Sequence, residues 1–266
     1  MKYYKPTSLL GTRNNKLLKG EGYGYTTYGL SLSPFTQNSQ GKNMCPMASK
    51  GCADACLFGS GHGSMAGVKK GRTNKTEFFL ADRAEFLKTL YIEIAQAELK
   101  HKLEGTKFAV RLNVTSDISW EKFKIKDNKN IFEMFPKVKF YDYTKNYLRF
   151  NSPLPKNYHL TFSRSETNEE IAFGLLDKGV NVAIVFDSIP QSYKGYEVIN
   201  GDLSDLRFLD KKKVIVGLKY KNITGKNANN SLAFENGFAV KTKQNYFEQL
   251  SENLINIVES KVKTII

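Results

Sequence analysis

The chain has 266 residues, of which 41% are hydrophobic, and its 18 Phe and 14 Tyr are enough for a sizeable core that does not depend on disulfides. It has no run of about 18 apolar residues that would span a bilayer, and its N-terminus lacks the apolar stretch of a secretory signal. The net charge of +14 indicates affinity for a polyanion, most commonly nucleic acid, although the lysines are spread along the chain. We therefore expect a cytoplasmic protein without a membrane partner.

No repeat or linker divides the chain, so we predict one domain over residues 1–266, with an N-terminal extension at 1–20 and a C-terminal helix at 243–266. Short runs rich in apolar residues are predicted as strands, and several are almost entirely apolar, as expected for strands buried on both faces of a parallel sheet. The predicted strands are residues 25–33, 108–114, 138–143, 158–162, 182–186, 197–199 and 214–218.

All three cysteines, Cys45, Cys52 and Cys56, fall within a segment that follows the first predicted strand. Three thiolates in one short loop can hold a soft metal and leave one coordination position for an outside ligand. The odd number argues against a disulfide framework, and a reducing cytoplasm favours metal binding. Structural thiols and redox or catalytic thiols are the alternatives.

The number of ligands separates two metal hypotheses. A structural zinc site needs four ligands, and the nearby candidate for the fourth is His62, although its Gly- and Ser-rich segment favours a solvated histidine over a ligand. The spacing C-x6-C-x3-C also differs from that of zinc fingers. Three thiolates without His62 match a [4Fe–4S] cluster with one iron open to a substrate or to S-adenosylmethionine.

Helical patterns alternate with the predicted strands. Asp82 and Glu85 form a capping-box pattern, and shorter helices are predicted at residues 130–136 and at 167–178, the latter ended by Gly179. The apolar stripe that follows the capping box is predicted to be core, and it comprises Phe86, Leu87, Leu90, Tyr91, Ile94 and Leu99. The alternation predicts an α/β fold, a single and partial (β/α) barrel of six or seven mostly parallel strands with the cysteine loop after the first.

Polar residues that follow the strands of such a barrel gather at one rim, where we expect the site. The predicted catalytic residues are Asp117, Lys145 and Glu166. The predicted substrate-binding residues are Asn113, Ser116, Tyr143, Ser163, Arg164, Asp202, Asp205 and Arg207. Each of these residues, taken singly, is weak evidence, because Asp and Ser after a strand commonly cap the following helix, but polar groups at several strand ends of one sheet favour a site.

Four segments, taken in order over about residues 20–240, resemble a bacteriophage family known as gene product 88. They are the cysteine segment, residues 110–118 (VRLNVTSDI), residues 140–145 (FYDYTK) and residues 200–218. The resemblance implies phage origin, and hence the host cytoplasm, and a shared fold more than a reaction. The chain is more loosely similar to radical S-adenosylmethionine enzymes, which carry three cysteines after the first strand of a partial β/α barrel with the spacing C-x3-C-x2-C. That similarity implies a cluster-ligand role for Cys45, Cys52 and Cys56.

Three functional hypotheses follow. The leading one is an iron–sulfur enzyme of radical or reductive type that acts on a polar or anionic small molecule, a nucleotide or a nucleic-acid base. The alternative is a zinc-stabilised nucleic-acid-binding protein of phage replication or host takeover, with the metal held by the cysteines and His62. A nuclease that uses rim carboxylates with Mg²⁺ requires several carboxylates to converge. Acidic Asp117, Asp202 and Asp205 favour a pocket over a nucleic-acid groove, and the sequence does not indicate the oligomeric state.

Overall fold

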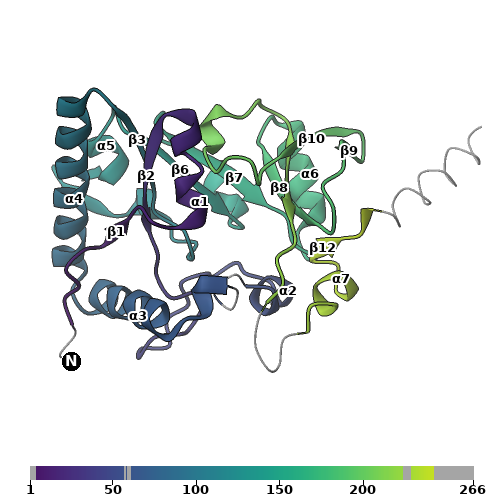
Figure 1. Ribbon diagram of the computed structural model, residues 1–266, viewed down its shortest axis with the longest axis horizontal. Coiled ribbons are helices and arrows are strands. Elements are labelled where there is room, and N and C mark those ends of the chain that lie inside the picture. The colour runs from purple at the N-terminus through teal and green to yellow at the C-terminus, as the bar shows by residue number, and fades with distance from the viewer. Residues whose placement is uncertain (1–3, 57, 59–60, 224–228, 243–266) are drawn as a thin grey trace, which may run out of the picture.

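The computed structural model describes residues 4–56, 58, 61–223 and 229–242 (Figure 1), so the helix predicted at 243–266 lies outside the described residues. The strands are β1 (Leu10–Gly11), β2 (Tyr25–Leu30), β3 (Lys107–Arg111), β4 (Lys124–Lys126), β5 (Lys129–Asn130), β6 (Lys139–Thr144), β7 (Tyr158–Ser163), β8 (Val182–Phe186), β9 (Ser192–Tyr193), β10 (Tyr196–Asn200), β11 (Ile215–Lys219) and β12 (Ala239–Val240). The α-helices are α1 (Asn15–Leu18), α2 (Lys50–Asp54), α3 (Ala66–Ala81), α4 (Arg83–Glu104), α5 (Ile131–Met134), α6 (Glu169–Asp177) and α7 (Leu232–Glu235).

The seven predicted strands are all present, as β2, β3, β6, β7, β8, β10 and β11, and they pair in parallel in one large sheet. The order across the sheet is β1-β2-β3-β6-β7-β8-β11-β10-β9, so the first five of the seven lie in chain order and the last two are exchanged. The α/β class with a mostly parallel sheet is therefore confirmed. No closed barrel forms within the described residues, because antiparallel β1 and β9 occupy the two edges of the sheet.

Part of the predicted N-terminal extension joins the sheet. Leu10 of β1 pairs with Leu30 of β2, and the side chains of Leu9 and Leu17 are buried. The short helix α1 is capped by Asn14, whose side chain accepts a hydrogen bond from the backbone N–H of Lys16. These contacts fix α1 against the edge of the sheet, where Lys16 reaches the cavity described below.

The long helix α4 begins where the capping pattern predicts, because the Asp82 side chain accepts a hydrogen bond from the backbone N–H of Glu85 at 3.0 Å. Most of its predicted apolar stripe is buried, but the prediction of Leu99 as a core residue is wrong, since 58% of Leu99 is exposed. Leu99 lies about 140° around the helix from the buried Ile94, on the solvent side. Within the described part of the chain, no helix combines the length and the apolar character needed to cross a bilayer.

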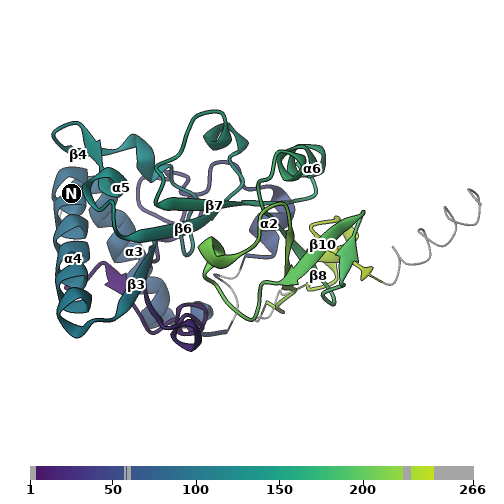
Figure 2. The ribbon, with the colours of Figure 1, turned by 90° about the horizontal axis from the view of Figure 1, so that it is seen from above.

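Helix α3 was not predicted, because its apolar residues gather at its C-terminal end instead of repeating at helical spacing. The short helices α5 and α6 were predicted, and Gly179 after α6 has a positive φ of 89°. Figure 1 shows α3 and α4 at the β1–β3 end of the sheet and α2 beside α7 near β12. Figure 2 shows the strands turning progressively from β3 to β8 and β10.

Two different strands pair with successive halves of one edge of β8, and the site lies where the pairing changes from one strand to the other. Strand β7 pairs with the first half of β8, through Ser163 and Ala183, whereas β12 pairs with the second half, through Ala239 and Val185. After Ser163, where β7 ends, the chain is therefore free to diverge from β8. The cavity opens at this point, at the carboxyl ends of the parallel strands, and both Ser163 and Val185 line it.

Candidate functional site

Local hydrogen bonds fold the cysteine loop. The backbone N–H of Cys45 donates to Asn43 Oδ1 at 2.8 Å, and Ser49 caps α2 by accepting from the backbone N–H of Cys52 at 3.2 Å. The backbone N–H of Asp117 donates to the carbonyl of Met44 at 2.8 Å, which joins this loop to the segment after β3. Cys45 therefore approaches the site from the loop before α2, Cys52 from α2 itself and Cys56 from the segment that follows it.

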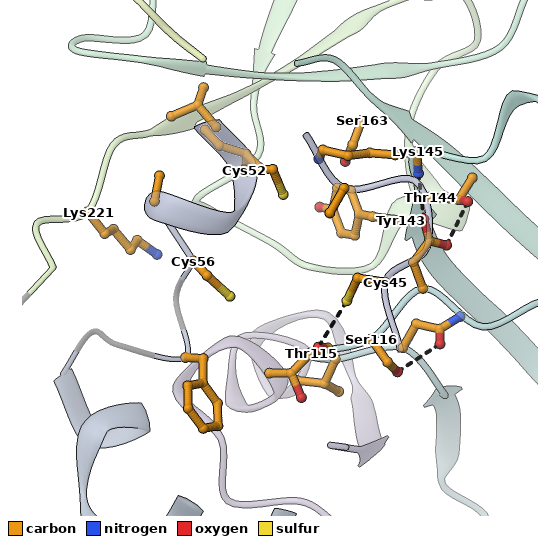
Figure 3. Close-up of a pocket in the computed structure, with 18 of the residues that line it drawn as sticks. Cys45, Cys52, Cys56, Thr115, Ser116, Tyr143, Thr144, Lys145, Ser163 and Lys221 are labelled. Carbon is orange, nitrogen blue, oxygen red and sulfur yellow. Dashed lines mark hydrogen bonds between the residues drawn. The ribbon is translucent and has the colours of Figure 1, made fainter. Parts of the chain in front are cut away.

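The three thiols face one cavity of about 230 Å³ at the carboxyl ends of the strands. Figure 3 shows the sulfur atoms of Cys45, Cys52 and Cys56 pointing into a common space from three sides. All three cysteines are half-buried and none forms a disulfide. The segment that sequence analysis singled out is therefore a wall of this cavity, and the thiols are directed inward.

Burial favours the neutral form of the Cys45 and Cys56 thiols. Burial raises the pKa of Cys45 to about 12, and it also raises the pKa of Cys56, where Arg72 and Lys145 act in the opposite direction. A thiol with a raised pKa is a weak nucleophile at neutral pH. This environment argues against Cys45 or Cys56 as a catalytic thiol, whereas metal ligation removes the thiol proton in any case.

Among the described residues, no group of three or more His, Cys, Asp or Glu side chains is placed to hold a single metal ion. The zinc hypothesis also needs His62, whose side chain lies outside the described part of the structure. Four ligands of one zinc must converge to about 2.0–2.3 Å from a single point. A four-iron cluster makes a different demand, because each thiolate binds its own iron and the sulfur atoms surround a larger space.

Most of the predicted site residues line this cavity with the cysteines. They are Asn113, Ser116, Asp117, Tyr143, Lys145, Ser163 and Asp202. They come from the ends of β3, β6, β7 and β10, four strands that are separated along the chain and joined by the parallel sheet. The site that the strand-end pattern predicted is thus one continuous surface.

Asn113 shapes the turn after β3. Its Oδ1 accepts hydrogen bonds from Ser116 Oγ at 3.0 Å, from the backbone N–H of Ile118 at 2.9 Å and from Trp120 Nε1 at 3.0 Å. Both Asn113 and Ser116 therefore have partners within the protein, and the buried Trp120 anchors the turn to the core.

Asp117 joins the ends of two strands. Its carboxylate accepts hydrogen bonds from Thr144 Oγ1 at 2.7 Å and from the backbone N–H of Lys145 at 2.8 Å, and Arg149 lies 3.5 Å away. The ammonium of Lys145, in contrast, lies 5.7 Å from the centre of the Phe238 ring, and Figure 3 shows its side chain extending toward Cys52. Of this pair, Lys145 is the one whose charged group faces the cavity.

Glu166 and Arg164 lie outside the cavity wall and hold neighbouring segments. The Glu166 carboxylate accepts hydrogen bonds from Ser49 Oγ and from the backbone N–H of Gly51, both at 2.8 Å, so it contacts α2. Arg164 pairs with Glu169 and donates to the carbonyl of Phe238 at 3.2 Å.

Asp205 and Arg207 also lie behind the cavity wall. Asp205 accepts hydrogen bonds from Arg111 at 2.7 Å and from the hydroxyl of Tyr141 at 3.0 Å, in an ion pair that is almost fully buried. Arg207 is buried as well and lies 3.1 Å from Asp210. A Mg²⁺ nuclease requires a cluster of carboxylates around the metal. The described residues do not form such a cluster.

Lys16 and Lys221 are among the cavity residues that sequence analysis did not single out. Lys16 lies in the segment predicted as an extension, and Lys221 follows β11. Burial, together with the charges of Arg111 and Lys221, lowers the pKa of Lys16 to about 8, against the opposing charges of Asp205 and Asp202. No local pattern marks Lys16, because only the pairing of β1 with β2 brings it to the cavity.

The family model described as Gene product 88 matches residues 8–236, which is most of the chain. The match includes the cysteine loop and the seven parallel strands from β2 to β11, and it confirms the resemblance carried by the four sequence segments. No curated protein and no solved structure matches the chain.

Proposed function

The chain belongs to the Gene product 88 family, and we propose that this phage protein is an iron–sulfur enzyme of radical or reductive type. In this proposal Cys45, Cys52 and Cys56 hold a [4Fe–4S] cluster with one iron open, and the cavity takes a polar or anionic small molecule. The observation that carries the proposal is the convergence of three thiols on one cavity whose other walls are strand ends with polar side chains.

The surroundings of the thiols suit such a cluster. A cluster bound by three thiolates carries net negative charge, and the charges of Arg72 and Lys145 both favour the thiolate form of Cys56. Phe35, Phe58 and the ring of Phe238 supply apolar surface in the same cavity, which limits the access of water. When bound, the cluster would supply single electrons next to the substrate.

S-adenosylmethionine is the co-substrate to test first, because an open iron offers it a coordination position. The parallel strands from β2 to β8 lie in chain order, which supports the finer proposal of a partial β/α barrel around this site. The spacing C-x6-C-x3-C differs from C-x3-C-x2-C, so the loop would wrap the cluster differently from that of the radical enzymes.

The experiment is a measurement of iron, acid-labile sulfide and the absorption spectrum on protein purified without oxygen. We expect about four irons and four sulfides per chain, lost together when any one of the three cysteines is replaced by Ala. Retention of the full cluster in all three single variants contradicts the proposal. Binding of S-adenosylmethionine is then measured on the loaded protein and on the cluster-free variants.

A zinc-stabilised nucleic-acid-binding protein is the second candidate, and the net charge of +14 favours it. It predicts one zinc and no sulfide per chain, zinc loss on His62→Ala, and DNA or RNA affinity that falls steeply as salt rises. The same metal analysis therefore decides between the two candidates.

A further inference from the structure

One side of the cavity carries hydrogen-bond donors that lack acceptors within the described residues. The Nε of Arg111 and the hydroxyl of Tyr143 are buried without a hydrogen-bond partner there. The ammonium of Lys16 likewise makes no hydrogen bond or ion pair with a described residue. All three side chains line the same cavity, and unpaired buried donors are costly unless a ligand or water meets them.

These donors are fixed in place before any ligand arrives. The guanidinium of Arg111 is held by Asp205 at 2.7 Å and lies 4.8 Å from the centre of the Tyr143 ring. Asp205 is fixed in turn by the hydroxyl of Tyr141. Only 4% of Arg111 is exposed, so its side chain has little freedom to lose when a ligand binds.

The charge of the cavity calls for an anion. Its wall contains the cationic side chains of Lys16, Arg111, Lys145, Lys219 and Lys221. The acidic side chains of the wall are those of Asp117 and Asp202, and both already have partners. Asp202 accepts from the backbone N–H of Lys219 at 2.8 Å and pairs with Lys221 at 3.4 Å. The positive charge of Lys16 is therefore left for a ligand.

We propose that Lys16, Arg111 and Tyr143 form an oxyanion subsite that binds the phosphate group of a phosphate monoester substrate. Three donors match the three terminal oxygens of a phosphate monoester, whereas a carboxylate presents two. The inference rests on the proposed role of this cavity as the substrate site, and it names the substrate class. It does not depend on the cluster, because the donors come from α1, β3 and β6 and not from the cysteine loop.

The test is calorimetric titration of the full chain with inorganic phosphate and, separately, with malonate. We expect Lys16→Met and Tyr143→Phe each to weaken phosphate binding about tenfold or more, because each removes a hydrogen bond to a charged group. Lys88→Met is the matched control: it removes the same charge from α4 at a side chain that is 69% exposed and outside the cavity wall. Its affinity for phosphate should stay within about twofold of wild type.

Wild-type phosphate affinity in both cavity variants overturns the subsite, as does the absence of phosphate binding by the wild-type chain. Malonate binding as tight as phosphate binding, with the same dependence on Lys16, overturns the choice of phosphate over carboxylate. Tyr143→Phe keeps the ring and its contact with Arg111, so the test stands even where Lys16→Met disturbs folding.

The subsite and the cluster are tested separately by including the triple variant Cys45→Ala, Cys52→Ala, Cys56→Ala. Phosphate binding that persists in this variant and depends on Lys16 supports the subsite, whatever the iron content of the wild type. A full cluster in the wild type without phosphate binding leaves the iron–sulfur proposal standing and removes the subsite.

Discussion

The carboxylate of Glu166 accepts a hydrogen bond at 2.8 Å from the backbone N–H of Gly51, which lies 115 residues earlier in the chain. The same carboxylate accepts from Ser49 Oγ at 2.8 Å. Glu166 therefore ties the first turn of α2, which carries Cys52, to the end of β7. A side chain at position 51 would displace the Glu166 carboxylate, because a Cβ there would lie 2.8–2.9 Å from it.

Glu166→Ala should reduce the iron retained per chain severalfold, because Cys52 loses its fixed position when both hydrogen bonds are removed. The free energy of unfolding should fall by about 1–3 kcal/mol. Glu166→Gln, which keeps one acceptor oxygen, should restore part of the iron. The control is Glu170→Ala, at an exposed position on α6. Equal iron content in the Glu166 and Glu170 alanine variants contradicts this positioning role.

Gly51→Ala should have a similar effect, because the new methyl group displaces the Glu166 carboxylate and breaks the same two hydrogen bonds. The two substitutions should therefore be strongly non-additive in a double-mutant cycle of unfolding free energies measured in urea. Gly67→Ala in α3 is the matched control, because a Cβ there meets nothing within 4 Å, and it should be neutral or stabilising. Additive effects of the substitutions at positions 51 and 166 argue against a shared contact.

The protonation of Asp142 should make the free energy of unfolding depend on pH. Burial raises the pKa of this carboxyl to about 7, although it accepts hydrogen bonds from Asn113 and Tyr158. The folded protein therefore holds a proton that the unfolded chain releases near pH 4. The stability contributed by Asp142 is full below about pH 4 and is lost as the pH rises to about 7, with a slope of up to about 1.4 kcal/mol per pH unit.

Asp142→Asn cannot lose this proton, so its unfolding free energy should fall less than that of wild type between pH 4 and 7. Urea unfolding of both proteins at several pH values measures the difference. Asp127→Asn, at an exposed turn, is the control and should follow the wild-type curve. Parallel curves for wild type and Asp142→Asn contradict the raised pKa.

The sequence predicted those features that depend on local pattern. Runs such as 182–186 are buried on both faces, and this one is indeed a central strand. Asn113 and Asp117 follow β3 by so few residues that they had to lie at its end. The exchange of β10 and β11 was not predicted, because pairing partners distant in the chain decide it. The bonds from Glu166 to α2 escaped for the same reason, since no spacing in the sequence encodes a contact between residues this far apart.

Phosphate binding at pH 8 should take up protons. The pKa of Lys16 is lowered to about 8 by burial and by Arg111 and Lys221, against the opposing charges of Asp205 and Asp202. A bound anion raises it again, so the part of the Lys16 population that is neutral at this pH becomes protonated. Titrations in two buffers of different ionisation enthalpy give the number of protons taken up. We expect up to about half a proton in wild type and none in Lys16→Met. Equal uptake in both proteins assigns the proton to another group.

The free energy of unfolding should fall far more when one partner of the Arg111–Asp205 ion pair is removed than when both partners are removed. Each side chain is 5% exposed, so Asp205→Ala leaves the Arg111 charge buried without its counter-ion and should cost about 3–5 kcal/mol of unfolding free energy. The double variant Arg111→Met, Asp205→Ala removes both charges and should recover much of that loss, while abolishing phosphate binding. Glu197→Ala breaks the exposed pair with Lys211 and should cost less than about 1 kcal/mol. If Asp205→Ala costs no more than Glu197→Ala in urea unfolding, Asp205 is not the group that holds the Arg111 guanidinium in place for the oxyanion subsite.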